Sequence, residues 1–356
     1  YGLVGSEMCI KDRPMRFNSA WAGFIAVLIA GLIVLFAVPQ IVSLFGIVQM
    51  TVFVAMAMYA LSQGFLWGFG GIMCFGQASF LGLGAYAYAI TAINLGDTSW
   101  GMLAGIAVPA IFALLLGYFM FYGRISDAYI GVITLTVSVI LFQLINSTSG
   151  AQYHIGQAEL GGFNGIPSVP TLNMPGDVSN VLSPTGIWYV SMALLIIVYV
   201  LLRLALASRF GRIVVAIREN ETRAMLLGYD ARLYKLLSFT ISAAIAGLAG
   251  CIYDNWGGFI SPTIFGLAMS AEVIIFVLVG GLGTLIGPIL GGVGLQYVMN
   301  LAGTQHKVDP NLGLGIVLVA FVLLVPQGVV PVIRDKAVQL FTRRGAKTAQ
   351  IQETSP

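Results

Sequence analysis

Apolar runs of about 20 residues recur along the whole chain, separated by short polar or charged stretches. A run of this length spans the hydrocarbon core of a bilayer as a helix, whereas a strand of a membrane barrel needs only about ten alternating residues. Helices also satisfy their backbone hydrogen bonds internally, as a lipid environment demands. The pattern therefore predicts an all-α polytopic membrane protein. Hydropathy windows of about 19 residues place ten transmembrane helices at 21–38, 47–66, 71–94, 101–122, 127–146, 187–206, 236–253, 265–282, 285–302 and 312–332.

Composition supports this fold class and excludes several functions. Of 356 residues, 58% are hydrophobic and 9% are charged, a balance foreign to soluble domains. The cysteines, Cys9, Cys74 and Cys251, have no metal-ligand spacing, and we expect them to be small buried hydrophobes. The sequence contains no GxxxxGK[ST], HExxH or GxSxG motif. We therefore expect a chain that is not an enzyme and binds no metal, cofactor or nucleic acid.

The distribution of Lys and Arg predicts the orientation in the membrane. Seven of the 17 basic residues fall between Arg203 and Lys235, five lie in 334–347, and 147–186 contains none. Positive charges close to a span stay on the cytoplasmic side. With ten spans and both termini cytoplasmic, 207–235 becomes an inner loop and 147–186 an outer one. The Gly-, Pro-, Ser- and Asn-rich outer loop predicts turns and short irregular structure.

The two ends of the chain differ from its transmembrane part, 15–335. The opening residues "YGLVGSEMCIKDRP", 1–14, lack the apolar core of a signal peptide and resemble translated adapter sequence. We expect them to be a non-native extension, with the natural chain starting at Met15. Residues 336–356 are expected to form a cytoplasmic tail.

Two glycine-rich tracts occupy comparable places in the two parts of the chain. They are "GFGGIMCFGQASFLGLGAYAYA" (68–89) and "VGGLGTLIGPILGGVGLQY" (279–297), each opening near a Gly-Gly pair. Such a pair of tracts is compatible with two related halves whose helices break at glycines and line a pathway. Close helix packing through small residues explains the same glycines equally well. The candidate break points are Gly70, Gly71, Gly280 and Gly281.

Polar side chains within the predicted spans are few, and most can be interhelical hydrogen bonds. Gln77 and Ser79 belong to the first glycine tract and are candidates for the pathway. Glu272 differs from them because an ionised carboxylate within a bilayer must face a partner, water or a pathway. A position close to the outer interface is the alternative for Glu272.

The stretch "RIVVAIRENETRAMLLGYDARLYK", 212–235, carries eight charges in an otherwise apolar chain. Asn220 is placed to cap a two-turn helix over 221–227, Gly228 to end it, and Asp230 to cap the following helix. We expect a docking helix whose apolar face contains Ala224, Met225 and Gly228. An ordinary basic inner loop is an equally good interpretation of the charges alone.

The run "AIRENETRAMLLGYDARLYKLLSFTISAAIAGLAGCIY", followed by "ISPTIFGLAMSAEVIIFVLVGGLGTLIGPILGG", resembles the permease subunits of bacterial ABC importers for branched-chain amino acids. The earlier "LSQGFLWGFGGIMCFGQASFLGLGAYAYA" is similar to the same family, and the resemblance covers about residues 45 to 330. In that family a cytoplasmic loop docks on the ATP-binding subunits. Here the spacing departs from the general loop pattern, since Gly228 follows Glu221 by seven residues rather than six and Thr222-Arg223 replace an alanine pair.

This resemblance implies a multi-pass permease of the bacterial inner membrane with no ATPase site of its own. It implies that ATP is hydrolysed by two partner ABC subunits, that a homologous permease completes the pathway, and that a periplasmic binding protein delivers solute. The implied path lies against "GGIMCFGQASF" and "AEVIIFVLVGGLGTLIG". The resemblance places coupling on Glu221, Ala224 and Gly228, and we expect the neighbouring Arg218, Glu219 and Arg223 to take part in it.

Three other functions stay open at this point. Permeases for urea or short amides belong to the same family and share much of this sequence. An ion-coupled secondary transporter needs no partner ATPase and is expected to depend on Glu272, although few ionisable groups lie within the spans. A membrane scaffold without transport is expected to tolerate changes in the glycine tracts that preserve packing.

Overall fold

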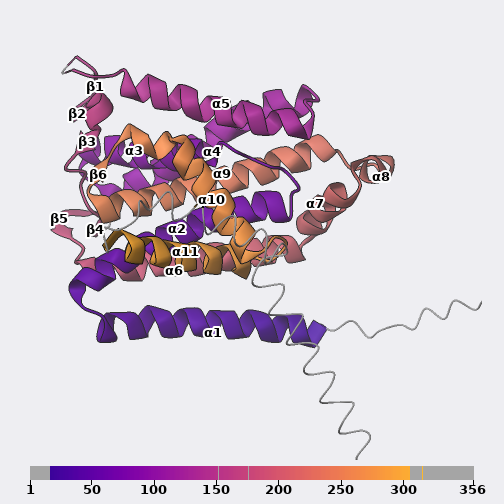
Figure 1. Ribbon diagram of the computed structural model, residues 1–356, viewed down its shortest axis with the longest axis horizontal. Helices are drawn as coiled ribbons and strands as arrows, with labels where there is room; N and C mark the ends of the chain where they lie inside the picture. Colours follow the sequence, from indigo (N-terminus) through magenta and orange to yellow (C-terminus); the bar gives the residue numbers. More distant parts are fainter. Residues whose placement is uncertain (1–16, 151, 175, 305–314, 316–356) are drawn as a thin grey trace, which may run out of the picture.

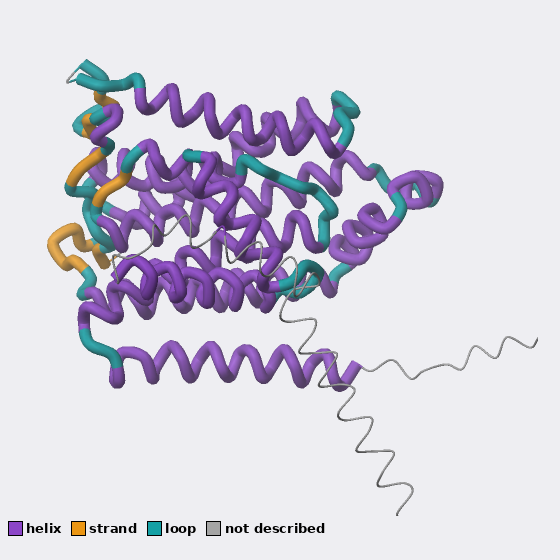
Figure 2. The backbone as a smooth tube through the Cα atoms, in the orientation of Figure 1, coloured by secondary structure: helices purple, strands orange, loops and turns teal. Residues whose placement is uncertain are grey.

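The computed structural model describes residues 17–150, 152–174, 176–304 and 315, which form an almost wholly helical membrane protein (Figures 1 and 2). Seven helices in this described part are long and apolar enough to cross a membrane. They are α1 (Phe17–Ile41), α2 (Leu44–Gly68), α3 (Gln77–Leu95), α4 (Thr98–Tyr122), α5 (Asp127–Asn146), α6 (Pro184–Ala207) and α9 (Ala231–Gly257). Two shorter apolar helices follow, α10 (Leu267–Gly280) and α11 (Ile286–Thr304).

These nine helices correspond to the first nine predicted spans, with one clear difference. The third span was expected from residue 71, but α3 begins at Gln77. Gly71 adopts a φ of +72°, which takes the chain out of the helical region, and the backbone runs on without helix to Gly76. The tenth span at 312–332, the extension at 1–14 and the tail at 336–356 lie outside the described residues.

Helices α2, α3, α4 and α9 pack closely, and α2 and α9 are the most enclosed helices of the bundle. Gly84 of α3 lies directly against the backbone of Gly247 in α9, and Gly247 lies against Gly105 in α4. A Cβ atom at Gly84 would overlap the Gly247 backbone. Lipid offers no hydrophobic force between helices, so this close approach supplies the packing energy.

One end of the bundle is covered by short strands from the long loop between α5 and α6 (Figure 1). The strand β3 pairs antiparallel with β6, which follows α9, with Ile166 opposite Ile260. The predicted turns and short irregular structure are confirmed here. The strands are β1 (His154–Ile155), β2 (Ala158–Glu159), β3 (Ile166–Pro167), β4 (Asn173–Met174), β5 (Asp177–Val181) and β6 (Phe259–Ile260), with short 3-10 helices η1 (Gly162–Asn164) and η2 (Pro262–Phe265).

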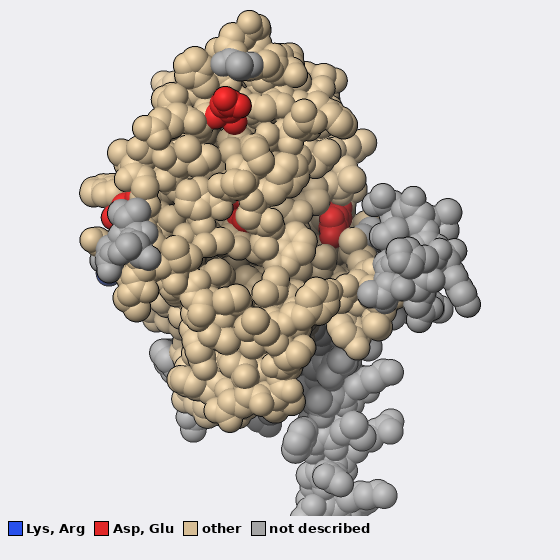
Figure 3. Space-filling view, turned by 90° about the vertical axis from the view of Figure 1, so that its left-hand side faces the viewer, with Lys and Arg blue, Asp and Glu red and all other residues tan. Residues whose placement is uncertain are grey.

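The opposite end carries α7 (Arg209–Glu219) and α8 (Glu221–Leu226), which project beyond the bundle (Figure 1). The described basic side chains gather at this end, whereas the charged groups visible on the strand-bearing end are mainly acidic (Figure 3). The two ends of the bundle therefore differ in both structure and charge. The described basic residues are Arg124, Arg203, Arg209, Arg212, Arg218, Arg223, Arg232 and Lys235.

Candidate functional site

The short helix α8 has the local structure that its sequence predicts. The Asn220 side chain accepts a hydrogen bond from the Arg223 backbone N–H at 2.9 Å and so caps the helix. Gly228 ends the turn with a φ of +90°, a conformation that glycine adopts without strain. Asp230 then caps α9 by accepting from the Arg232 N–H at 3.1 Å. Two tight turns therefore fix the direction of α8 relative to α9.

Side-chain contacts hold α8 against the body of the protein. Lys235 of α9 is only 13% exposed, and its Nζ lies 2.7 Å from Glu221 Oε2 and 3.4 Å from Asp127 Oδ1. Ala224 packs with Ile217 of α7 in a small buried cluster. A salt bridge and a buried contact thus restrain the helix from two sides.

The outward face of α8 differs from the expected one. Ala224 was expected to enter a groove in a partner, but it is 3% exposed and faces the protein itself. The exposed apolar side chains are Met225, Leu226 and Leu227, of which Leu226 is 84% and Leu227 is 77% exposed. Met225 is exposed, as a docking face requires, and its role in docking stays a prediction. The sequence did not single out Leu226 and Leu227. Which face of α8 turns towards the protein is set by the contact of Ala224 with Ile217 and Ala231, which the sequence of α8 does not reveal.

The basic and acidic residues around α8 have different surroundings. Arg218, at the end of α7, forms an ion pair with Glu219 and also donates from Nη1 to the backbone carbonyl of Gly68. Arg223 is exposed beside the apolar tip. Both arginines are thus at the surface, but the Arg218 guanidinium also reaches the end of α2, whereas Arg223 lies beside the apolar tip.

Both predicted glycine breaks are present. Helix α2 ends at Gly68 and is followed by turns through Gly70 and Gly71, whereas α10 ends at Gly280 and the chain turns at Gly281 before α11 starts. A Cβ atom at Gly68 would lie 2.9 Å from the backbone nitrogen of Gly283. The two breaks, far apart in sequence, therefore touch each other.

Gln77 and Ser79 are buried at the start of α3. Gln77 Nε2 donates to Ser62 Oγ of α2 at 3.0 Å and to Ser242 Oγ of α9 at 2.9 Å. Gln77 therefore joins three helices, which is a packing role. The Ser79 hydroxyl has no hydrogen-bond partner within the described part of the chain.

Two carboxylates lie towards the strand-bearing end of the bundle. Glu272 lies in the second turn of α10 and is partly buried. Asp254, in the last turn of α9, is 0% exposed, and neither of its oxygens has a hydrogen-bond partner among the described residues. Sequence reasoning missed Asp254 because it ended the span at residue 253. The apolar residues on both sides of Asp254 and Asn255 in "CIYDNWG" were the available signal that the helix continues.

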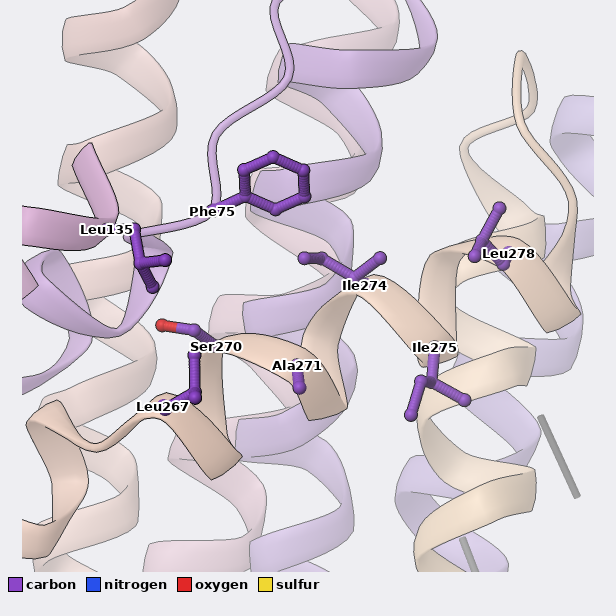
Figure 4. A pocket seen from close by; sticks show the side chains of 8 residues that line it. All are labelled: Phe75, Leu135, Leu267, Ser270, Ala271, Ile274, Ile275 and Leu278. Atoms are coloured by element: carbon purple, nitrogen blue, oxygen red, sulfur yellow. The ribbon is translucent and has the colours of Figure 1, made fainter. Parts of the chain in front are cut away.

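A pocket of about 270 Å³ lies between the segment after α2, helix α5 and helix α10 (Figure 4). Phe75 and Leu135 face α10 across it, and Ser270 contributes the single hydroxyl of the lining. That hydroxyl has no partner in the described structure. The pocket joins the two tracts expected to flank a path, since Phe75 belongs to the first and Ala271, Ile274, Ile275 and Leu278 to the second.

Comparisons with known proteins agree with this architecture. The family model described as branched-chain amino acid transport system / permease component matches residues 43–325. The chain is 29% identical over 303 residues to the high-affinity branched-chain amino acid transport system permease protein LivM of Escherichia coli, covering 78% of this chain and 68% of that protein.

LivM of Salmonella typhimurium is 29% identical over 293 residues, with 76% of this chain and 66% of that protein covered. LivH of Escherichia coli is 29% identical over a shorter stretch, 40% of this chain and 46% of that protein. The chain thus spans about two thirds of the length of both LivM proteins. No solved structure matches it significantly. With most of its length matched, the chain belongs to the family of permease components of branched-chain amino acid transport systems.

Proposed function

We propose that this chain is the permease subunit of an ATP-driven importer for branched-chain amino acids in a bacterial inner membrane, with both termini cytoplasmic. Two ATP-binding subunits dock at the α8 end and hydrolyse the ATP, which this chain does not bind. A homologous permease completes the pathway, as the pairing of the names LivM and LivH among the relatives suggests. A periplasmic binding protein delivers solute at the strand-bearing end.

The observation that carries the proposal is the exposed apolar tip of α8 at the basic end of the bundle. Met225, Leu226 and Leu227 project where the membrane-spanning helices have ended. Exposed apolar groups beside charged ones are typical of a surface that binds another protein. The caps at Asn220 and Asp230 and the Lys235 salt bridge hold this surface rigid, so a push on α8 reaches α9.

The choice of solute rests on the relatives and on the pocket of Figure 4. Its walls are aliphatic and aromatic, and Ser270 supplies its one polar side chain. An aliphatic side chain gains free energy from leaving water for such walls, at about 25 cal/mol per Å². The charged amino and carboxylate groups of an amino acid find no partner beyond Ser270 in this lining, and neither do the polar groups of urea or a short amide, so the pocket suits only an aliphatic side chain and the relatives decide between the solutes. A urea or amide importer is therefore the alternative within the family.

The coupling role is tested in the complete transporter reconstituted in liposomes. Gly228→Pro is expected to uncouple ATP hydrolysis from uptake, because proline cannot adopt the φ of +90° that ends α8. Leu226→Glu is expected to weaken docking of the ATP-binding subunits, since a charge replaces the most exposed apolar contact. Thr222→Ala changes a neighbouring exposed residue without altering the apolar tip and serves as the matched control. Normal coupling in both Gly228→Pro and Leu226→Glu would refute the proposal.

An ion-coupled secondary transporter is the second candidate, favoured by the two carboxylates in the outer half of the bundle. Asp254 lacks a partner among the described residues, and Glu272 lies in an apolar helix. Such groups mark ion or proton pathways in transporters. If uptake survives an inactive ATPase partner but is lost in Glu272→Gln, this second function is the correct one.

A further inference from the structure

Arg218 links helix α7 to the C-terminal end of the transmembrane helix α2. Its Nη1 donates a hydrogen bond to the carbonyl oxygen of Gly68, although the two residues are 150 positions apart. The carbonyls of Phe65, Leu66 and Trp67 accept backbone N–H groups from residues 69 to 72. Gly68 is the next carbonyl along, and the guanidinium supplies its donor. A cation at a helix C-terminus is also favoured by the helix dipole.

The turn after α2 is shaped to receive this side chain. Gly71 has a φ of +72°, and a Cβ atom there would lie 2.7 Å from Arg218 Cγ. Any other residue at this position would therefore meet both backbone strain and a steric clash. The stem of Arg218 thus packs on the glycine turn while its head binds the end of α2.

The same turn touches the second glycine break. Gly68 lies against the backbone of Gly283, between α10 and α11, and Gly64 lies against Pro288 of α11. A displacement of the end of α2 must therefore move the α10–α11 connection as well. Three segments meet here, namely the end of α7, the turn Gly68–Gly71 and the turn Gly280–Gly283. We call this meeting point the glycine junction.

We infer that Arg218 is the positioning residue through which the docking helix controls the glycine junction, so that its hydrogen bond to Gly68 transmits ATP-driven motion to the inner end of the pathway. This inference rests on the proposed function. It adds a connection that α8 alone does not explain, because Glu221 and Lys235 tie α8 to α9 and Asp127 of α5 rather than to the glycine tracts.

Arg218→Ala is tested in the complete reconstituted transporter against Arg212→Ala. Arg212 lies on the same helix and is exposed, donating to the Ala207 carbonyl at 3.3 Å. We expect Arg218→Ala to lower uptake by about tenfold, within the range of coupling between two sites, while ATP hydrolysis stimulated by the binding protein continues. Arg212→Ala is expected to keep both activities. Arg218→Lys retains a donor for the Gly68 carbonyl and is expected to restore most of the uptake.

A second measurement follows the accessibility of the glycine junction directly. In a variant with the native cysteines replaced by alanine, Leu282→Cys places an exposed thiol on the second break. Its labelling by a membrane-impermeant maleimide in inside-out vesicles is expected to change when the ATPases are trapped with vanadate, and to stay constant when Arg218→Ala is added.

Two results would overturn the inference. One is normal uptake by Arg218→Ala. The other is a joint loss of uptake and ATPase stimulation, which places Arg218 in docking rather than in transmission. Failure of the proposed function is distinguished from both, because Leu226→Glu then leaves ATP hydrolysis and uptake coupled.

Discussion

Two neighbouring buried residues near the strand-bearing end of α9 differ in their hydrogen bonding. Asn255 Oδ1 accepts hydrogen bonds from the Tyr88 hydroxyl at 3.1 Å and from the Leu172 backbone N–H at 2.8 Å. It thereby anchors the loop between α5 and α6 to α3 and α9. Asp254 beside it is equally buried, but its carboxylate has no such partner in the described residues.

Substituting these two residues is therefore expected to give contrasting results. Asn255→Ala leaves the buried Leu172 N–H without its acceptor and should lower the free energy of unfolding by about 1–3 kcal/mol. Asp254→Asn keeps the volume and removes a carboxyl group that lacks a described partner, so stability should be unchanged or higher. Thermal unfolding of the purified protein in detergent measures both. Equal destabilisation by the two substitutions would show that Asp254 is a paired, ionised group.

At the residue scale, the sequence predicts contacts between residues close together in the chain and misses contacts between distant ones. The caps at Asn220 and Asp230 and the stop at Gly228 depend on neighbours within four residues, so they were predictable. The hydrogen bond from Arg218 to Gly68 joins residues 150 positions apart, and the inward orientation of Ala224 depends on Ile217 and Ala231. No periodicity within a helix encodes such contacts.

At the scale of elements, some glycines allow helices to pack closely and others break helices. The sequence analysis had given these two roles as alternatives for the same glycines. Gly84, Gly105 and Gly247 lie inside helices and permit close packing. Gly71 and Gly281 lie between helices and break them. The packing interpretation therefore holds for the first set of glycines and the helix breaks are present at the second, whereas the pathway along these breaks stays a prediction. The two related halves also stay a prediction.

The packing glycines are tested by Gly84→Ala. Its new methyl group would overlap the backbone of Gly247, which cannot yield as a side chain does, so α3 and α9 must separate and stability should fall by about 1–3 kcal/mol. Gly294→Ala in α11 is the matched control, since nothing lies within 4 Å of its Cβ position and alanine favours the helix. Unfolding in detergent should separate the two variants. An unchanged Gly84→Ala would mean that this helix contact is loose.

At the scale of the whole molecule, the described part is polarised, with short strands at one end and the basic helices α7 and α8 at the other (Figure 1). The count of ten spans came from hydropathy, and seven long helices with two shorter ones account for nine of them. Hydropathy could not place the start of α3, because residues 71–76 are as apolar as a helix but carry a backbone turn.

Topology is tested by labelling single cysteines with an impermeant maleimide. Phe163→Cys in the outer loop and Leu226→Cys in α8 are both at highly exposed positions, 72% and 84%. The positive-inside rule predicts labelling of Phe163→Cys in intact spheroplasts and of Leu226→Cys only in inside-out vesicles. The native Cys74 and Cys251 are buried and should stay silent. The reverse pattern would invert the proposed orientation.

Helix α9 connects the two ends of the molecule as a single rod. It follows α8 at Ala231, and beyond Gly257 the chain enters β6, which pairs with β3 of the loop between α5 and α6. A helix of this length is about 40 Å long. When a rigid helix pivots about its middle, its two ends move in opposite directions. In the proposed importer, such a pivot of α9 would couple the opening of a path on one side of the membrane to its closing on the other.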